Sequence, residues 1–200
     1  IENGTILVRN NRIEEVGAAV QIPSGAEVVD LSGRTVVPGF VDTHAHLRPA
    51  FGVHRKDLWV YQANLAYGVT ATRDPQTATT DVLTYADLVR AGETVGPRVY
   101  STGPGVFFQE NLSSLDETRD LMRRYADYFD TKTIKMYVSG TRKQRQWIIQ
   151  AARELEIMPT TEGSLNFKQN TTETLDGYPG LEHSIPVYPL YDDMVALYAG

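Results

Sequence analysis

Residues 38–47 read PGFVDTHAHL, and this stretch decides how the rest of the chain is interpreted. Its apolar and β-branched start predicts a strand over residues 39–44. Side chains two positions apart in a strand point to the same side, so His44 and His46 are expected to project together. Two imidazoles on one side form a pair of ligands for a divalent metal, with Asp42 as their expected hydrogen-bonding partner. The competing interpretation is a chance His-x-His on a surface loop.

Strand-like and helix-like segments alternate after this motif. The predicted strands cover residues 39–44, 69–73, 98–101, 133–138, 157–161 and 180–183. Helical spacing of apolar residues lies between them, around residues 58–65, 80–92, 114–129 and 148–155. Repeated strand-then-helix units, about six by this count, predict an α/β fold with a parallel sheet and helices outside it. A doubly wound open sheet is the alternative, but no glycine-rich phosphate loop follows the first strand.

The segment before residue 39 has a different character. Strand-like runs at residues 5–8 and 12–16 flank Asn10 and Asn11, which form a good turn pair. Residues 26–31 predict a further strand, and no helical period is present. This segment is therefore expected to be a separate, small β-structure.

The composition is that of an ordinary globular protein, with 200 residues, 42% of them hydrophobic and 22% charged. A net charge of -6 argues against a nucleic-acid partner and against a polybasic membrane patch. The absence of cysteine excludes thiol nucleophiles, disulfides and cysteine-ligated metals. No apolar run approaches the roughly 18 residues of a membrane span. The chain begins at Ile1 rather than Met, so it leaves the localisation open.

Lys135 is the second candidate site residue. In the predicted strand over residues 133–138, Ile134 and Met136 share an apolar face, and Lys135 lies on the other face. In a barrel strand that face looks inward, where an ammonium must be paired or neutralised. Carbamylation by carbon dioxide would turn the amine into a carboxylate able to bridge two metal ions. The alternative is an edge strand with Lys135 in solvent.

His183 is the third candidate. It ends the last predicted strand, where a further ligand of a barrel enzyme would be expected. A lone histidine is usually structural or exposed. His183 is therefore a candidate ligand only because the His44 and His46 pair and Lys135 are candidates as well. His54 has no such context and is interpreted as a surface or helix residue.

Four motifs together resemble the amidohydrolase superfamily, particularly its imidazolonepropionase- and prolidase-like members. The motifs are PGFVDTHAH at residues 38–46, GVTATRD at 68–74, IKMYVSG at 134–140 and LEHS at 181–184. They resemble barrel strands one, two, four and six of the superfamily, and residues 1–38 resemble part of its flanking β-sandwich. The resemblance implies an incomplete (β/α)8 TIM barrel of about six units over residues 39–200. The chain would be the N-terminal portion of such an enzyme.

The resemblance also implies a role for each candidate residue. His44 and His46 would bind one divalent metal, for which Zn²⁺ is the expected ion, and carbamylated Lys135 would bridge to a second metal bound by His183. A metal-activated hydroxide would attack a small amide or cyclic amide and break its carbon–nitrogen bond. Lys135 and His183 are therefore the expected catalytic residues.

Two departures from the family pattern concern the later strands. Thr160 stands where the family carries a ligand histidine on the fifth strand. Glu162 could supply an oxygen ligand instead, or it could cap the following segment, and the second metal could be weak or absent. The family's eighth strand carries a proton-shuttling aspartate, and nothing after His183 resembles that strand. Asp192 and Asp193 are expected to open a helix over residues 194–199, and the chain is expected to be a fragment.

Two other functions compete with the enzyme interpretation. One is a non-catalytic, barrel-derived scaffold that has lost metal ligands. The other is a binding module whose pocket lies near Tyr100, Phe107, Phe108 and Tyr137. The loop at residues 103–113, with Gln109, is the expected substrate-facing segment. An open barrel is also expected to associate through its unpaired strand edges or as a homo-oligomer, and to be inactive alone.

Overall fold

The chain divides into two compact units, Ile1–Pro38 and Gly39–Gly200. The computed structural model describes residues 1–49, 52–77, 79–107, 110–137, 140–163, 166–189, 191–193 and 196. The second unit carries all the candidate site residues, so the first is described briefly and by itself.

The first unit is built on a β-hairpin. Strands β1 (Thr5–Arg9) and β2 (Arg12–Gly17) pair antiparallel. Asn10 and Asn11 join them with φ values of 50° and 59°, the left-handed conformation that a tight hairpin turn requires. The hairpin confirms the first prediction for this segment. The strand predicted over residues 26–31 is wrong: these residues form no ladder, and their apolar side chains stay exposed. The assignment of residues 1–38 to a partial sandwich stays a prediction.

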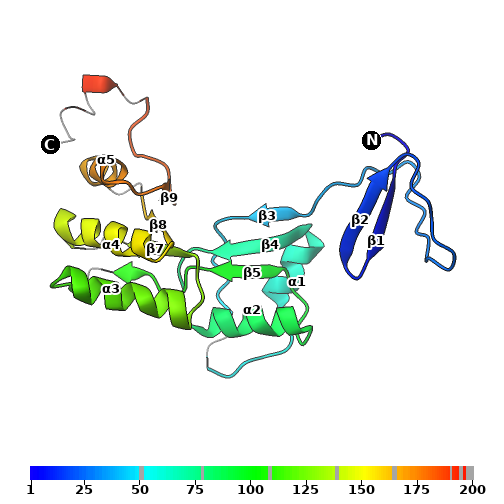
Figure 1. Ribbon diagram of the computed structural model, residues 1–200, viewed down its shortest axis with the longest axis horizontal. Coiled ribbons are helices and arrows are strands. Elements are labelled where there is room, and N and C mark those ends of the chain that lie inside the picture. Colours follow the sequence, from blue (N-terminus) through cyan, green and yellow to red (C-terminus); the bar gives the residue numbers. More distant parts are fainter. Residues whose placement is uncertain are drawn as a thin grey trace. The chain divides into compact units, whose positions relative to one another are not determined.

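The second unit is an α/β structure with two parallel sheets (Figure 1). The first sheet has the order β3 (Phe40–Asp42), β4 (Val69–Asp74), β5 (Arg98–Ser101). The second has the order β6 (Val106–Phe107), β7 (Thr133–Tyr137), β8 (Met158–Thr161), β9 (Gly180–Leu181). All pairings within the two sheets are parallel, as the alternating pattern predicts. Neither sheet closes among the described residues.

Helices connect successive parallel strands. They are α1 (Trp59–Ala66), α2 (Asp81–Ala91), α3 (Leu115–Arg123) with the π-helical turn Arg124–Tyr128, α4 (Arg142–Glu154) and α5 (Phe167–Asp176). The predicted stop of α2 at Gly92 is confirmed, since its φ of 78° is the left-handed conformation that glycine adopts readily. In Figure 1, α3 and α4 run side by side, and the structure packs them together. Among the described residues, no helix is long and apolar enough to cross a membrane.

Ser114 caps the start of α3. The Ser114 hydroxyl accepts the backbone N–H of Glu117 at 3.1 Å, as a capping box requires. The Glu117 carboxylate, however, accepts the backbone N–H and the hydroxyl of Ser113 rather than the backbone N–H of Ser114. Glu117 therefore bonds to the residue before the N-cap instead of to the N-cap itself.

Helix α5 and strand β6 were not predicted from the sequence. Helix α5 buries Asn170, Thr172 and Glu173 rather than an apolar stripe, so it has little hydrophobic period to detect. Asn166 caps its start by accepting the Gln169 backbone N–H at 3.1 Å. The helix expected over residues 194–199 lies largely outside the described residues.

Packing of the loop after β3 determines which way its histidines face. Ala45 and Leu47 are buried in an apolar cluster with side chains of α1, α2 and β5. Alternation then leaves His44 half-buried and His46 exposed on the opposite side. The same alternation on β7 places Ile134 and Met136 in a second apolar cluster, against α3 and α4, and turns Lys135 away from it.

Candidate functional site

His44 and His46 lie together just beyond the carboxyl end of β3, as predicted. Their ring centroids are 5.0 Å apart, and the rings meet edge to face at 87°. The His44 ring also lies 4.8 Å from that of His183, which follows β9 in the other sheet. Three imidazoles from two sheets therefore lie in one place.

The Nδ1 atom of His44 faces a carboxylate. It lies 3.1 Å from Oε2 of Glu182, whose side chain is only 6% exposed. Asp42, the expected partner of this ring, instead accepts the backbone N–H of His44 at 3.0 Å. Partial burial lowers the pKa of His44; Lys135 and His46 add to this effect, and Glu182 opposes it. Asp42 therefore shapes the loop, and Glu182 holds the ring.

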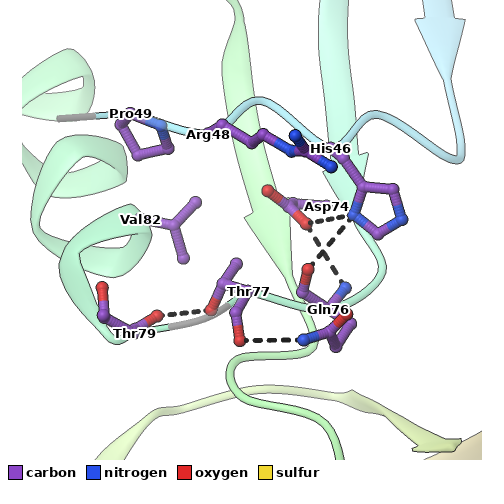
Figure 2. Close-up of a pocket in the computed structure, with 8 residues that line it drawn as sticks. All are labelled: His46, Arg48, Pro49, Asp74, Gln76, Thr77, Thr79 and Val82. Carbon is purple, nitrogen blue, oxygen red and sulfur yellow. Dashed lines mark hydrogen bonds and ion pairs between the residues drawn. The ribbon is translucent and has the colours of Figure 1, made fainter. Parts of the chain in front are cut away.

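The Nδ1 atom of His46 also faces acceptors. It lies 3.2 Å from the carbonyl oxygen of Gln76 and 3.4 Å from Oδ1 of Asp74, at the end of β4. Asp74 is 2% exposed, and burial raises the pKa of its carboxyl despite backbone N–H bonds from Leu47 and Gln76. Figure 2 shows the His46 ring beside Asp74 and the Arg48 side chain above them.

A cavity of about 390 Å³ opens beside His46 (Figure 2). Arg48 and Asp74 are its charged side chains, and Pro49 and Val82 contribute apolar walls. The binding-module interpretation expected a pocket elsewhere, near Tyr100. Tyr100 is 58% exposed, and Phe108 and Gln109 lie outside the described residues.

Lys135, Glu162 and His183 form a continuous set of ion-pair contacts. Nζ of Lys135 lies 2.6 Å from Oε2 of Glu162, and Oε1 of Glu162 lies 3.2 Å from Nε2 of His183. Lys135 is 1% exposed, so the alternative of an edge strand with this lysine in solvent is wrong. Its burial fits the predicted inward face of β7, and Glu162 neutralises its charge.

Arg73 and Glu182 complete the cluster, and sequence reasoning did not assign them a role. Nη2 and Nη1 of Arg73 donate to Oε1 and Oε2 of Glu182 at 2.8 and 3.1 Å. The Thr160 hydroxyl also donates to Oε1. Burial alone would raise the pKa of Glu182, but the bonds from Arg73 and Thr160 outweigh it and hold the pKa below its usual range. The available clue was period two on β4, which places Arg73 on one face with Val69 and Ala71.

The donors of this cluster suit a divalent metal, but they are paired with one another. Imidazole nitrogens and carboxylate oxygens are ligands that zinc accepts. Nδ1 of His44 and Nδ1 of His46 each face a hydrogen-bond acceptor. Nε2 is therefore the ring nitrogen that could coordinate a metal ion. In the part of the chain that the structure describes, no three His, Asp or Glu side chains already form a metal-binding group.

Gly163 controls the approach of the loop after β8 to His183. Its φ is +71°, and an added Cβ would lie 2.6 Å from the backbone oxygen of His183. Gly163→Ala is expected to lower the free energy of unfolding by about 2–4 kcal/mol, from left-handed strain plus overpacking. Urea denaturation measures this loss. Gly25→Ala is the control, because its φ of +81° gives similar strain with no atom near the new Cβ. Equal losses in the two variants would contradict the close approach.

Comparison with known proteins places the chain in a family. A family model described as the amidohydrolase family matches residues 27–127, which is half of the chain. The chain belongs to the amidohydrolase family. An imidazolonepropionase from Mycolicibacterium smegmatis is 32% identical over 132 residues, covering 60% of this chain and 32% of that protein. A dihydroorotase from Geobacter metallireducens is 43% identical over 53 residues, covering 26% of this chain and 12% of that protein.

The fold of this amidohydrolase chain is shared with solved structures. The crystal structure of an amidohydrolase matches with a TM-score of 0.73 at 18% identity, covering 100% of this chain and 60% of that chain. The chain thus spans about a third of the length of its imidazolonepropionase relative and three fifths of this structural neighbour. The family predicted from the four sequence motifs is confirmed.

Proposed function

We propose that this amidohydrolase chain carries most of the metal ligands of a hydrolase that breaks carbon–nitrogen bonds in small amides or cyclic amides. The observation that carries the proposal is the convergence of His44, His46, His183, Glu162 and Lys135 beyond the ends of parallel strands. Family membership supports a metal-dependent hydrolase. Active sites of parallel α/β folds lie at this edge of the sheet.

The proposal includes the architecture around the site. We infer that the two parallel sheets are parts of one (β/α)8 barrel, with β3, β4, β7, β8 and β9 as its strands one, two, four, five and six. Residues 1–38 would belong to the flanking sandwich. Among the described residues, β3 and β9 each pair along one side only. Association through these edges, or as a homo-oligomer, remains part of the proposal.

The residues present would hold one or two divalent ions, with Zn²⁺ the proposed metal. His44 and His46 would offer Nε2 atoms, because their Nδ1 atoms already face acceptors. His183 and Glu162 would complete the ligand set together with Lys135 as its carbamate. A bound divalent ion would lower the pKa of water and polarise the carbonyl group of the amide.

The cavity beside His46 is the proposed position of the substrate. Arg48 can pair with an anionic or carbonyl group, and Val82 offers an apolar contact. The Lys135–Glu162 ion pair, 2.6 Å long, contacts His183, one of the proposed metal ligands. Small amides or cyclic amides are proposed as the substrates because of the family, and the cavity only offers them a place.

His44→Ala tests the proposal in the intact protein. The variant is expected to bind zinc at least roughly 100-fold more weakly, a larger loss than removal of an outer partner causes. Elemental analysis of the dialysed protein and titration with zinc measure the change. His54→Ala is the matched control, because His54 pairs with Asp81 on the surface at 2.6 Å and lies outside the cluster.

Full retention of zinc by His44→Ala would overturn the proposed metal centre. Absence of zinc from the unaltered, intact protein would favour the non-catalytic scaffold instead. Thr160 does not favour that scaffold by itself, because the three imidazoles still lie together.

A further inference from the structure

We propose that Glu182, clamped by Arg73, is a positioning residue that fixes the imidazole of His44 with Nδ1 protonated and Nε2 free to bind metal. The proposal rests on the proposed metal centre. Neither family resemblance nor composition pointed to Glu182, and only the folded structure brings its carboxylate to the ring.

The contacts of Glu182 come from several strands at once. Its carboxylate receives hydrogen bonds from Arg73 on β4 and Thr160 on β8, and faces His44 beyond β3. Its backbone N–H donates to the Thr161 carbonyl oxygen at 2.8 Å, which fixes where the side chain begins. A carboxylate held by this many partners has little freedom to rotate away from the ring.

The tautomer of His44 follows from this arrangement. An ionised carboxylate accepts hydrogen bonds and cannot donate one, so Nδ1 of His44 must carry the proton that faces Glu182. In the neutral imidazole the other nitrogen, Nε2, then presents its lone pair. A carboxylate that fixes a ligand histidine in this way also raises its basicity toward the metal.

Arg73 keeps the carboxylate ionised and in place. Its planar guanidinium contacts both oxygens of Glu182, a geometry that lysine cannot reproduce. It also lies 3.4 Å from the Thr43 carbonyl oxygen and 3.3 Å from the Thr160 hydroxyl. Thr160 stands at the position of an expected ligand histidine. Its hydroxyl instead bonds to both Arg73 and Glu182 and helps to hold this ion pair in place.

His46 shows the same arrangement independently. Its Nδ1 atom faces Oδ1 of Asp74 and the Gln76 carbonyl oxygen, and Asp74 is nearly inaccessible. Both imidazoles of the His-x-His pair thus have Nδ1 held by buried acceptors. The repetition at two histidines leaves Nε2 of both rings as the nitrogen that could bind a metal ion.

The test compares Glu182→Gln with the unaltered, intact protein. In the metal-free protein, histidine ring nitrogen shifts measured by NMR are expected to show His44 protonated at Nδ1, and the variant is expected to shift toward the Nε2-protonated form. Zinc titration is expected to show binding roughly 10- to 100-fold weaker in the variant. Arg73→Lys keeps the positive charge but cannot contact both oxygens of Glu182, and it is expected to give a smaller loss of zinc affinity.

Asp176→Asn is the matched control. Asp176 is 8% exposed and is clamped by both Nε and Nη2 of Arg142 at 2.8 Å, yet it lies outside the histidine cluster. It should lose stability without a change in zinc affinity or in the His44 tautomer. Unchanged tautomer and affinity in Glu182→Gln would overturn the role of Glu182 alone. Failure of the unaltered protein to bind zinc would overturn the proposed function, and with it the metal role of Glu182.

Discussion

Replacing Arg73 by methionine is expected to lower the free energy of unfolding by about 3–5 kcal/mol at neutral pH, because it leaves a buried carboxylate without its cation. The side chain of Glu182 is 6% exposed and that of Arg73 is 17% exposed. Methionine occupies much of the same volume but offers no N–H donor. The remaining contacts, from Thr160 and His44, cannot supply the lost positive charge.

The pH dependence of this loss has a definite sign. The pKa of Glu182 in the folded protein lies below its usual value of 4.5. Its contribution to stability is therefore fully present above that value and is lost as the pH falls through the folded-state pKa. Without Arg73, a large part of what lowers this pKa is removed, so the folded-state pKa is expected to rise. The difference in free energy of unfolding between Arg73→Met and the unaltered protein should thus be largest near neutral pH and should become smaller in the acid range.

Urea denaturation at neutral and acid pH measures both effects. Arg142→Met is the matched control, because Arg142 makes the same bidentate contact but is 40% exposed, so its loss should be smaller. In the double variant Arg73→Met with Glu182→Leu, most of the stability should return, since an apolar pair avoids the buried charge. A loss in Arg73→Met that is equal to the control and independent of pH would contradict the argument.

Local pattern explains which parts of the site could be predicted. The common direction of His44 and His46 follows from strand period, and burial of Ala45 and Leu47 between them reinforces it. The position of Lys135 on the face of β7 opposite Ile134 and Met136 follows from the same rule. These predictions needed only neighbouring residues and the expectation of parallel strands.

The Arg73–Glu182 ion pair could not be predicted because the two residues are distant in sequence. Arg73 and Glu182 are 109 positions apart, and their contact depends on how two sheets are arranged. Asp42 was the expected partner of the histidines because it is nearby, yet its side chain bonds to the backbone. The predicted strand over residues 26–31 failed for a related reason: β propensity alone does not supply a pairing strand.

Lys135→Met is expected to cause large losses of both stability and hydrolysis. Nζ of Lys135 lies 2.6 Å from Oε2 of Glu162, and the lysine side chain is 2% exposed. Among the described residues, removal of the cation leaves the Glu162 carboxylate with His183 as its remaining ion-pair partner, and it is expected to lower the free energy of unfolding by about 3–5 kcal/mol. In the intact protein, the proposed hydrolysis of para-nitroacetanilide or hydantoin, small amide probes, is expected to fall by at least roughly 100-fold, more than for the loss of an outer partner.

Lys143→Met is the control for this substitution. Lys143 is an exposed lysine on α4 whose Nζ lies 5.2 Å from the Trp147 ring, so its loss should barely change stability or zinc affinity. Thermal unfolding, zinc titration and probe hydrolysis are measured for both variants. Retention of zinc and of hydrolysis by Lys135→Met would exclude Lys135 from the metal centre.

The ion pair also constrains the proposed carbamate. Carbamylation of the paired ammonium takes two deprotonations: the ammonium loses one proton, and the amine releases a second when its nitrogen bonds to carbon dioxide, so a cation beside Glu162 is replaced with an anion. Two carboxylates at this distance repel each other, so a divalent cation held by Glu162 and the carbamate would stabilise the carbamate. Carbon dioxide uptake and metal binding must therefore be coupled. Bicarbonate is expected to strengthen zinc binding in the unaltered protein and to have no effect in Lys135→Met, whereas bicarbonate-independent binding in both would show that Lys135 acts as an ammonium paired with Glu162.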